Sequence, residues 1–160
     1  MGPEPAPFMK LQKLIVLRHG EYEHGGFLTD LGRASIDNLA VSLLKFGHLN
    51  TDSMAVLCSR ELRAIKSAQV FIGTLWLQGK IDEESHKELY SSDRECDTTN
   101  ALRVIKGYSD KVETLVVFTH LEMVQEIPRV VGADVPRGYH DVEYAKGFII
   151  DCKAHTCEQI

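Results

Sequence analysis

Short apolar runs, each followed directly by polar residues, constrain the fold of this chain most strongly. The runs are Leu14 to Leu17, Met54 to Cys58 and Leu115 to Phe118. A continuous apolar run of this length is typical of a parallel strand that is buried on both faces. Segments with apolar residues at helical spacing lie between the runs, so strands and helices alternate. The alternation predicts an α/β fold, a three-layer α/β/α sandwich with a mostly parallel central sheet.

The helical segments can be placed from their apolar faces. The expected faces are Ile36, Leu39, Ala40, Leu43 and Leu44, with Thr29 or Asp30 as N-cap; Ile65, Ala68, Ile72, Leu75 and Trp76, ending near Gly79; Ala101, Leu102 and Ile105, ending at Gly107; and Met123, Val124, Ile127, Val130 and Val131. Pro128 conflicts with an early start of the last helix, which therefore either begins late or is kinked. We further expect a short edge strand over His86 to Tyr90 and a final strand within 144–151.

The size of the chain predicts a single domain. A chain of 160 residues with 44% hydrophobic residues can bury one core but not two. Residues 1–11 hold three of the five prolines, and we expect them to form a disordered leader. Residues 12–160 are then one domain. Its oligomeric state does not follow from the sequence.

Charge and cysteine usage narrow the possible partners and compartment. The net charge is −5, so no overall positive field favours nucleic acid or an anionic membrane surface. The four cysteines do not form a compact disulfide framework, no run is long enough to span a membrane, and the N-terminus lacks a secretion signal. We therefore expect a cytoplasmic protein that meets any phosphate through a local cluster of cations.

Polar side chains follow each of the three apolar runs. Arg18 and His19 follow the first, Ser59 and then Arg63 follow the second, and Thr119 and His120 follow the third. Ligands of open α/β sheets bind outside the carboxyl ends of the strands, so these residues are expected to share one pocket. Two guanidinium groups and two imidazoles suit a dianionic phosphoryl group. A neutral histidine can attack phosphorus, and a charged one can stabilise its oxygens.

Four segments, from Leu14 to Cys152, resemble the histidine phosphatase superfamily, the phosphoglycerate-mutase-like proteins of branch 1. They are the Arg-His-Gly signature in Leu17-Arg18-His19-Gly20-Glu21; Leu28-Thr29-Asp30-Leu31-Gly32; Ser59-Arg60-Glu61-Leu62-Arg63-Ala64; and Val117-Phe118-Thr119-His120. Gly25 stands where many relatives carry asparagine, and Thr119 stands where glycine is usual.

The resemblance implies a metal-independent phosphatase without a cofactor. His19 would become phosphorylated, Arg18, Arg63 and His120 would bind and polarise the phosphoryl group, and water would hydrolyse the phosphohistidine intermediate. Glu21 would orient an arginine or remain an ordinary loop carboxylate. We expect the remaining substrate-binding residues to be Gly20, Ser59 and Thr119.

The motifs contain no acidic proton donor, and this absence indicates which class of phosphorylated substrate the protein takes. Larger relatives carry an acidic donor inside insertions that this chain lacks, and Glu88, Asp93 and Glu95 are the nearest candidates. An alkoxide leaving group needs such an acid, whereas the conjugate acid of imidazole has a pKa of about 6.5. The chain thus looks most like the short SixA-type phosphohistidine phosphatases, which act on signalling proteins.

Two other functions remain open from the sequence. One is a phosphatase for small phosphomonoesters, and the other is a phosphate- or phosphopeptide-binding module without turnover. Cys152, His155 and Cys157 do not have the spacing of zinc ligands, so no metal site is expected. His24 and Arg60 are either exposed or at the rim of the pocket.

Overall fold

The computed structural model of the protein describes residues 10–135 and 141–160. The expected leader lies mainly outside these residues, but its boundary needs a correction. Leu11 is completely buried, and the amides of Lys10 and Leu11 both donate to the carbonyl of Ser109. The folded domain therefore includes residues 10 and 11, because this backbone pairs with the segment before the third buried strand.

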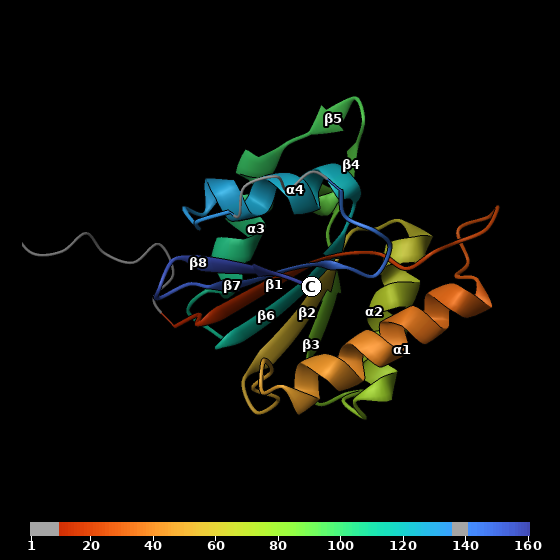
Figure 1. Cartoon of the computed structure of the whole chain (residues 1–160), viewed down its shortest axis with the longest axis horizontal. Helices are drawn as coiled ribbons and strands as arrows, with labels where there is room; N and C mark the ends of the chain where they lie inside the picture. The colour runs from red at the N-terminus through yellow and green to blue at the C-terminus, as the bar shows by residue number, and fades with distance from the viewer. Residues whose placement is uncertain (1–9, 136–140) are drawn as a thin grey trace, which may run out of the picture.

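Six strands form one central sheet in the order β3-β2-β6-β1-β7-β8, and β4 and β5 form a separate two-stranded hairpin at the top of the view in Figure 1. The strands are β1 (Lys13–Arg18), β2 (Met54–Cys58), β3 (Asp82–Ser85), β4 (Ser91–Ser92), β5 (Glu95–Cys96), β6 (Thr114–Thr119), β7 (Gly147–Asp151) and β8 (Thr156–Gln159). The first four strands of that order are parallel, whereas β7 and β8 are antiparallel to their neighbours. The predicted mostly parallel sheet is confirmed.

Helices cover both faces of this sheet, as Figure 1 shows. They are α1 (Asp30–Lys45), α2 (Leu62–Thr74), η1 (Lys87–Leu89, a single 3-10 turn), α3 (Thr98–Tyr108) and α4 (Leu121–Val130). The crossovers through α1 and α2 step along the sheet in one direction, and the crossover through α3 steps back. Because such crossovers are right-handed, the reversal places α3 on the opposite face from α1 and α2.

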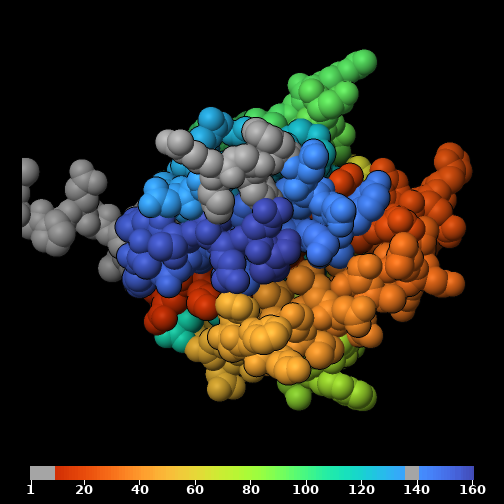
Figure 2. All heavy atoms as spheres, viewed as in Figure 1, coloured from red at the N-terminus to blue at the C-terminus, as the bar shows by residue number. Residues whose placement is uncertain are grey.

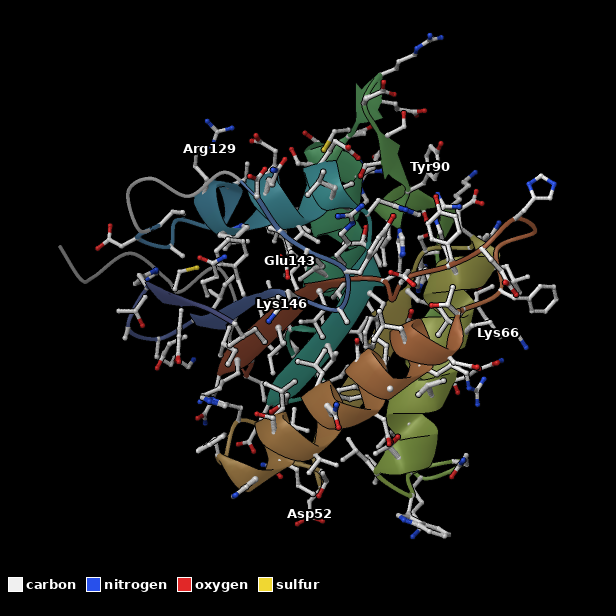
Figure 3. All side chains as sticks on the ribbon, turned by 45° about the vertical axis from the view of Figure 1, so that its right-hand side comes forward. Asp52, Lys66, Tyr90, Arg129, Glu143 and Lys146 are labelled. Carbon is white, nitrogen blue, oxygen red and sulfur yellow. The ribbon has the colours of Figure 1, made fainter. Side chains whose placement is uncertain are left out.

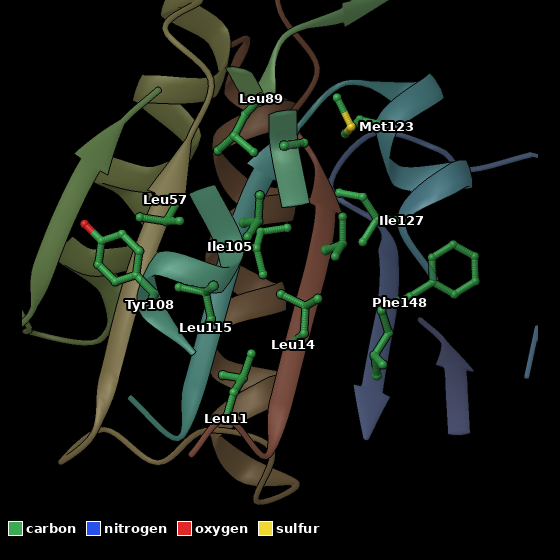
Figure 4. Packing of buried hydrophobic residues seen from close by; sticks show 14 of the residues in the cluster. Leu11, Leu14, Leu57, Leu89, Ile105, Tyr108, Leu115, Met123, Ile127 and Phe148 are labelled. Carbon is green, nitrogen blue, oxygen red and sulfur yellow. The ribbon is translucent and has the colours of Figure 1, made fainter. Parts of the chain in front are cut away.

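The two hydrophobic clusters explain why the central strands read as continuous apolar runs. Leu14 and Val16 pack against α3 and α4, while Ile15 and Leu17 pack against α1 and α2. Figure 4 shows the first of these clusters, with Leu14 and Leu115 of adjacent strands beneath Ile105 and Ile127. Alternate side chains thus enter opposite cores, so the interior positions of these strands are apolar on both faces and polar residues stand only at the strand ends.

The structure differs from two predictions, one on the edge strand of the sheet and one on the end of the second helix. The expected strand over His86 to Tyr90 is wrong, because this segment holds the 3-10 turn η1, and the edge strand is instead β3. The side chains of β3 are all exposed and mostly acidic, so this strand carries no apolar signal. Helix α2 ends at Thr74, two residues before the exposed Trp76, whose φ of 58° leaves the helical region.

The last helix and the last strand also depart from expectation. Helix α4 begins at Leu121, directly after His120, so the late start is wrong and Pro128 lies inside the helix. Proline removes one hydrogen bond there, but Met123, Val124 and Ile127 are buried against the sheet, and this burial offsets the loss. Strand β8 was not foreseen, because only Cys157 is partly buried within it. No helix in the described ranges is long and apolar enough to cross a membrane.

We predict that Gly147→Ala strongly lowers the free energy of unfolding. A Cβ atom at Gly147 would lie 1.9 Å from the carbonyl oxygen of Val16, so β7 would have to separate from β1. Gly107→Ala is the matched control, because a Cβ there meets no atom within 4 Å and alanine favours the helix by up to about 1 kcal/mol. Urea unfolding compares the two, and an equal or greater stability for Gly147→Ala would contradict the close approach.

Candidate active site

A pair of buried histidines lies where the two central strands end. Strands β1 and β6 are parallel neighbours that pair Arg18 with Thr119, and His19 and His120 are the next residue of each. Their ring centroids are 5.2 Å apart with an interplanar angle of 66°. Each histidine is only 3% exposed. The sheet pairing alone therefore brings together two imidazoles that are about a hundred residues apart in sequence.

The backbone sets the tautomer of His19. Its Nδ1 lies 2.9 Å from the carbonyl oxygen of Gly20. A carbonyl can only accept, so Nδ1 carries the proton and donates it. Nε2 then holds a lone pair, which accepts from Nε of Arg63 at 3.2 Å. The Nε2 lone pair of His19 therefore faces a cation inside the site, and it can attack an anionic group only once the hydrogen bond from Arg63 is given up.

His120 is held by two partners from the β2–α2 region. Its Nε2 lies 2.7 Å from the hydroxyl oxygen of Ser59, and its Nδ1 lies 3.5 Å from a terminal nitrogen of Arg63. Because a guanidinium only donates, Nδ1 is the acceptor, and Nε2 carries the proton toward Ser59. Arg63 thus contacts both histidines from the first turn of α2.

Both imidazoles are neutral at neutral pH. Burial lowers the pKa of His19 to about 4, against the hydrogen bond to Gly20 that raises it, and the charges of Arg63 and Arg18 lower it further. Burial also lowers the pKa of His120 to about 3, with contributions from His19, Arg63 and Arg18. Burial, aided by the charges of the two arginines, therefore keeps both imidazoles unprotonated.

The two arginines are held by carbonyl, carboxylate and aromatic contacts. One terminal nitrogen of Arg18 donates to the carbonyl of Val142 at 2.9 Å, and its Cζ lies 4.0 Å from the ring centroid of Tyr144. Arg63 pairs with Glu61 at 3.7 Å and lies 4.8 Å from the ring of Tyr22. Within the described residues, the buried Nε of Arg18 has no hydrogen-bond partner. A bound anion would supply an acceptor for this donor.

The other residues expected to bind substrate form hydrogen bonds within the protein. The amide of Gly20 donates to Ser67 Oγ at 2.8 Å, and its carbonyl holds His19. The carboxylate of Glu21 accepts from the hydroxyl of Thr29 at 2.8 Å and forms no ion pair with either arginine among the described residues. The hydroxyl of Thr119 donates to the carbonyl of Leu89.

The glycine of the Leu28-Thr29-Asp30-Leu31-Gly32 segment, where α1 begins, has a steric explanation. Thr29 is the N-cap, and its side chain accepts from the amide of Gly32. A Cβ atom at Gly32 would lie 2.1 Å from the carbonyl oxygen of Glu21. The helix can therefore pack against the loop after His19 only because residue 32 is glycine.

The proposed proton donors do not reach the histidines. Glu88 lies 4.0 Å from the His86 ring, and Asp93 and Glu95 are exposed in the β4–β5 hairpin. No described carboxylate forms a hydrogen bond or ion pair with His19 or His120. Within residues 10–135 and 141–160, the pair is connected to a carboxylate only through Arg63, which contacts Glu61.

Three tyrosines next to the histidines were not foreseen. Tyr22 and Tyr144 lie 5.2 and 5.7 Å from the ring of His19, and Tyr90 lies 5.2 Å from that of His120. Each lies in a loop, and no local sequence pattern marks it. Figure 2 shows the segment before β7 (blue) against the loop after β1 (red to orange), and Figure 3 labels Tyr90 and Glu143.

The remaining candidates lie outside this cluster. His24 and Arg60 are exposed. Cys152 is buried, His155 is exposed in the turn before β8, and Cys157 pairs with Ile150. In the part of the chain that the structure describes, no three histidine, cysteine or acidic residues converge as metal ligands.

Comparison with known proteins identifies the fold. No protein-family model and no curated protein matches the sequence. The chain is similar to a SixA protein histidine phosphatase in complex with tungstate (20% identity, 92% of this chain and 94% of that chain, TM-score 0.59). It is also similar to an ecdysone phosphate phosphatase from Bombix mori, likewise with tungstate (11%, 93% and 92%, 0.66), and to a phosphoglycerate mutase from Bacillus anthracis (16%, 96% and 93%, 0.65). The chain therefore has the fold of histidine phosphatases and phosphoglycerate mutases, as the motifs predicted.

We predict that acid destabilises the protein through the histidine pair. Unfolded histidine has a pKa of about 6.5, so between pH 6.5 and about 4 the unfolded chain binds protons that the folded site excludes. The free energy of unfolding should fall in this range by up to about 1.4 kcal/mol per pH unit for each histidine. Urea unfolding of the parent and of His19→Gln/His120→Gln at several pH values measures this. An unchanged slope in the double variant would contradict the lowered pKa values.

Proposed function

We propose that this protein is a metal-independent phosphatase that works through a phosphohistidine intermediate on His19, and that its substrate is phosphohistidine on a protein. The observation that carries the proposal is the hydrogen bond from His19 Nδ1 to the Gly20 carbonyl, which leaves the Nε2 lone pair beside Arg63. Binding alone requires neither a fixed tautomer nor a buried neutral imidazole. The names of similar structures, two of them phosphatases with bound tungstate, support the same chemistry.

In the first step, a dianionic phosphoryl group binds between Arg18, Arg63 and the two histidines. Nε2 of His19 attacks phosphorus, the bond from phosphorus to Nε2 forms, and the bond to the leaving nitrogen breaks. The dianion offsets the arginine charges that lower the histidine pKa values in the free site. The pKa of His120 rises on binding, and the protonated ring then stabilises the phosphoryl oxygens.

In the second step, water attacks phosphorus of the intermediate. A bond from oxygen to phosphorus forms, the bond to Nε2 breaks, and inorganic phosphate leaves with the proton shared between phosphate and solvent. Nε2 regains its lone pair, and the Gly20 carbonyl again holds Nδ1–H. The enzyme returns to its starting tautomer without further rearrangement.

The choice of phosphohistidine follows from the missing acid. No described carboxylate contacts either histidine, and positioned acid catalysis is typically worth about 10²-fold or more for an ester. A leaving imidazole has a conjugate acid with a pKa of about 6.5, so water near neutral pH can protonate it. A site with cations and no carboxylic acid beside the histidines therefore suits a phosphoramidate better than an alkyl ester.

We predict that the protein hydrolyses a phosphohistidine peptide faster than small alkyl phosphate esters, with chelator present and no added metal. His19→Ala should abolish turnover and acid-labile labelling, whereas His24→Ala, an exposed histidine in the same loop, should retain both. Faster turnover of alkyl esters would contradict the substrate assignment. Binding of phosphate without turnover of any substrate would contradict the enzyme and favour a binding module.

We also predict that Arg63→Ala lowers kcat/KM by about 10- to 150-fold. Arg63 contacts both histidines, and a charge-assisted hydrogen bond is typically worth about 1.5–3 kcal/mol. Arg60→Ala, three residues earlier and exposed, is the matched control and should stay near the parent value. Steady-state kinetics on one substrate compares them. Equal effects of both substitutions would place Arg63 outside the site and point to general electrostatics.

A further inference from the structure

Three tyrosine rings from three separate loops enclose the histidine pair. Tyr22 follows β1, Tyr90 follows η1, and Tyr144 precedes β7. Tyr22 and Tyr144 both contact the ring of His19 and lie 6.1 Å from each other, edge to face. Tyr90 contacts the ring of His120 edge to face. The histidine pair is therefore bordered by aromatic rings on several sides.

The backbone on both sides of Tyr90 is anchored. The carbonyl of the buried Leu89 accepts from the hydroxyl of Thr119, the residue before His120. On the other side, Ser91 Oγ donates to Glu122 and accepts from the amide of Met123, both at 3.1 Å. Tyr90 is thus held between the end of β6 and the start of α4, beside His120.

Tyr144 and Tyr22 are held in a similar way. The carbonyl of Val142 accepts from Arg18, and the amide of Ala145 lies 3.1 Å from the carbonyls of both Arg18 and His19. Ala145 has a φ of 58°, an uncommon conformation for a residue other than glycine, which costs about 1 kcal/mol or more. Tyr22 forms an isolated bridge with Leu28 at the base of its loop. These contacts fix the backbone beside each ring before any ligand binds.

The tyrosines also contact the two arginines of the site. Arg63 lies over the ring of Tyr22, and Arg18 lies over the ring of Tyr144. A phosphoryl group between these guanidinium groups therefore has tyrosine rings at its margin. Tyr22 is 37% exposed, and Tyr90 and Tyr144 are partly exposed, so their surfaces remain open to a ligand. Aromatic rings favour other planar rings through offset and edge-to-face contacts, beyond the area that is buried.

We propose that Tyr22, Tyr90 and Tyr144 form the subsite for the leaving group and select a planar aromatic ring, here the imidazole of phosphohistidine. This inference rests on the proposed function, because it needs the phosphoryl group beside His19. It adds a specificity determinant that lies outside the Arg-His-Gly signature. An alkyl or sugar phosphate would present no flat face to these rings.

A binding comparison tests the subsite independently of turnover. Phenylphosphonate and methylphosphonate carry the same anionic group and differ in the ring. We expect the parent to bind phenylphosphonate about fivefold or more tighter, and Tyr22→Leu, Tyr90→Leu and Tyr144→Leu each to reduce that ratio at least twofold. Tyr22→Phe should retain the ratio, as should Phe27→Leu, which removes an exposed aromatic side chain of the same loop that contacts Lys66.

A kinetic comparison then connects the subsite to the leaving group. Phosphoimidazole and phosphoramidate both break a bond from phosphorus to nitrogen, but only the first has a ring. The ratio of their kcat/KM values should fall in each leucine variant and persist in Tyr22→Phe and Phe27→Leu. Turnover of neither compound by the parent would refute the proposed function, and the phosphonate ratio would still decide the subsite. Equal binding of both phosphonates, or an unchanged ratio in all leucine variants, would overturn the inference.

Discussion

The parallel pairing of β1 with β6 is the interaction on which the site depends. It aligns Arg18 with Thr119, and the amide of His19 continues the ladder by donating to the carbonyl of Thr119. A shift of this register by one residue would send the apolar side chains of β1 into the wrong cores and would move His19 away from His120. The catalytic geometry and the hydrophobic core are therefore set by the same register, so the burial of Ile15, Val16 and Leu17 also stabilises the histidine pair.

The local charge beside the histidines is opposite in sign to the net charge of the whole molecule. The chain carries a net charge of −5, but Arg18 and Arg63 lie next to the histidines. No described carboxylate forms an ion pair with either histidine. These cations and burial keep the free imidazoles neutral, and an arriving dianion reverses that effect. Under the proposed function, binding of a phosphoryl dianion raises the pKa of His120, and the charge that results stabilises the phosphoryl oxygens. Glu61 contacts only the outer side of Arg63 and leaves its contacts with both histidines intact.

The segment beside His120 has two features that bear on the site. The hydroxyl of Thr119 donates to the carbonyl of Leu89, and the next residue, Tyr90, contacts the ring of His120. The same segment places no carboxylate against His120, since Glu88 faces His86 and the β4–β5 hairpin carries Asp93 and Glu95 at the surface. This segment therefore supplies an aromatic ring to the site. Under the proposed function, both features favour an imidazole leaving group.

The sequence by itself determined the three central strands and the four principal helices. It also predicted that Arg18, His19, Arg63 and His120 lie together at one edge of the sheet. These signals are local. A strand that is buried on both faces requires a continuous apolar run, and the polar residues of the site follow directly where such a strand ends. Only the tertiary structure decided the hydrogen bond of Glu21 to Thr29, the edge strands β3 and β8, and the three tyrosines. Edge strands are half exposed and need no apolar pattern, while a tyrosine in a loop becomes part of a site only when separate loops meet. The Arg-His-Gly tripeptide thus marks His19 in the sequence, whereas the surroundings of His19 depend on contacts between distant segments.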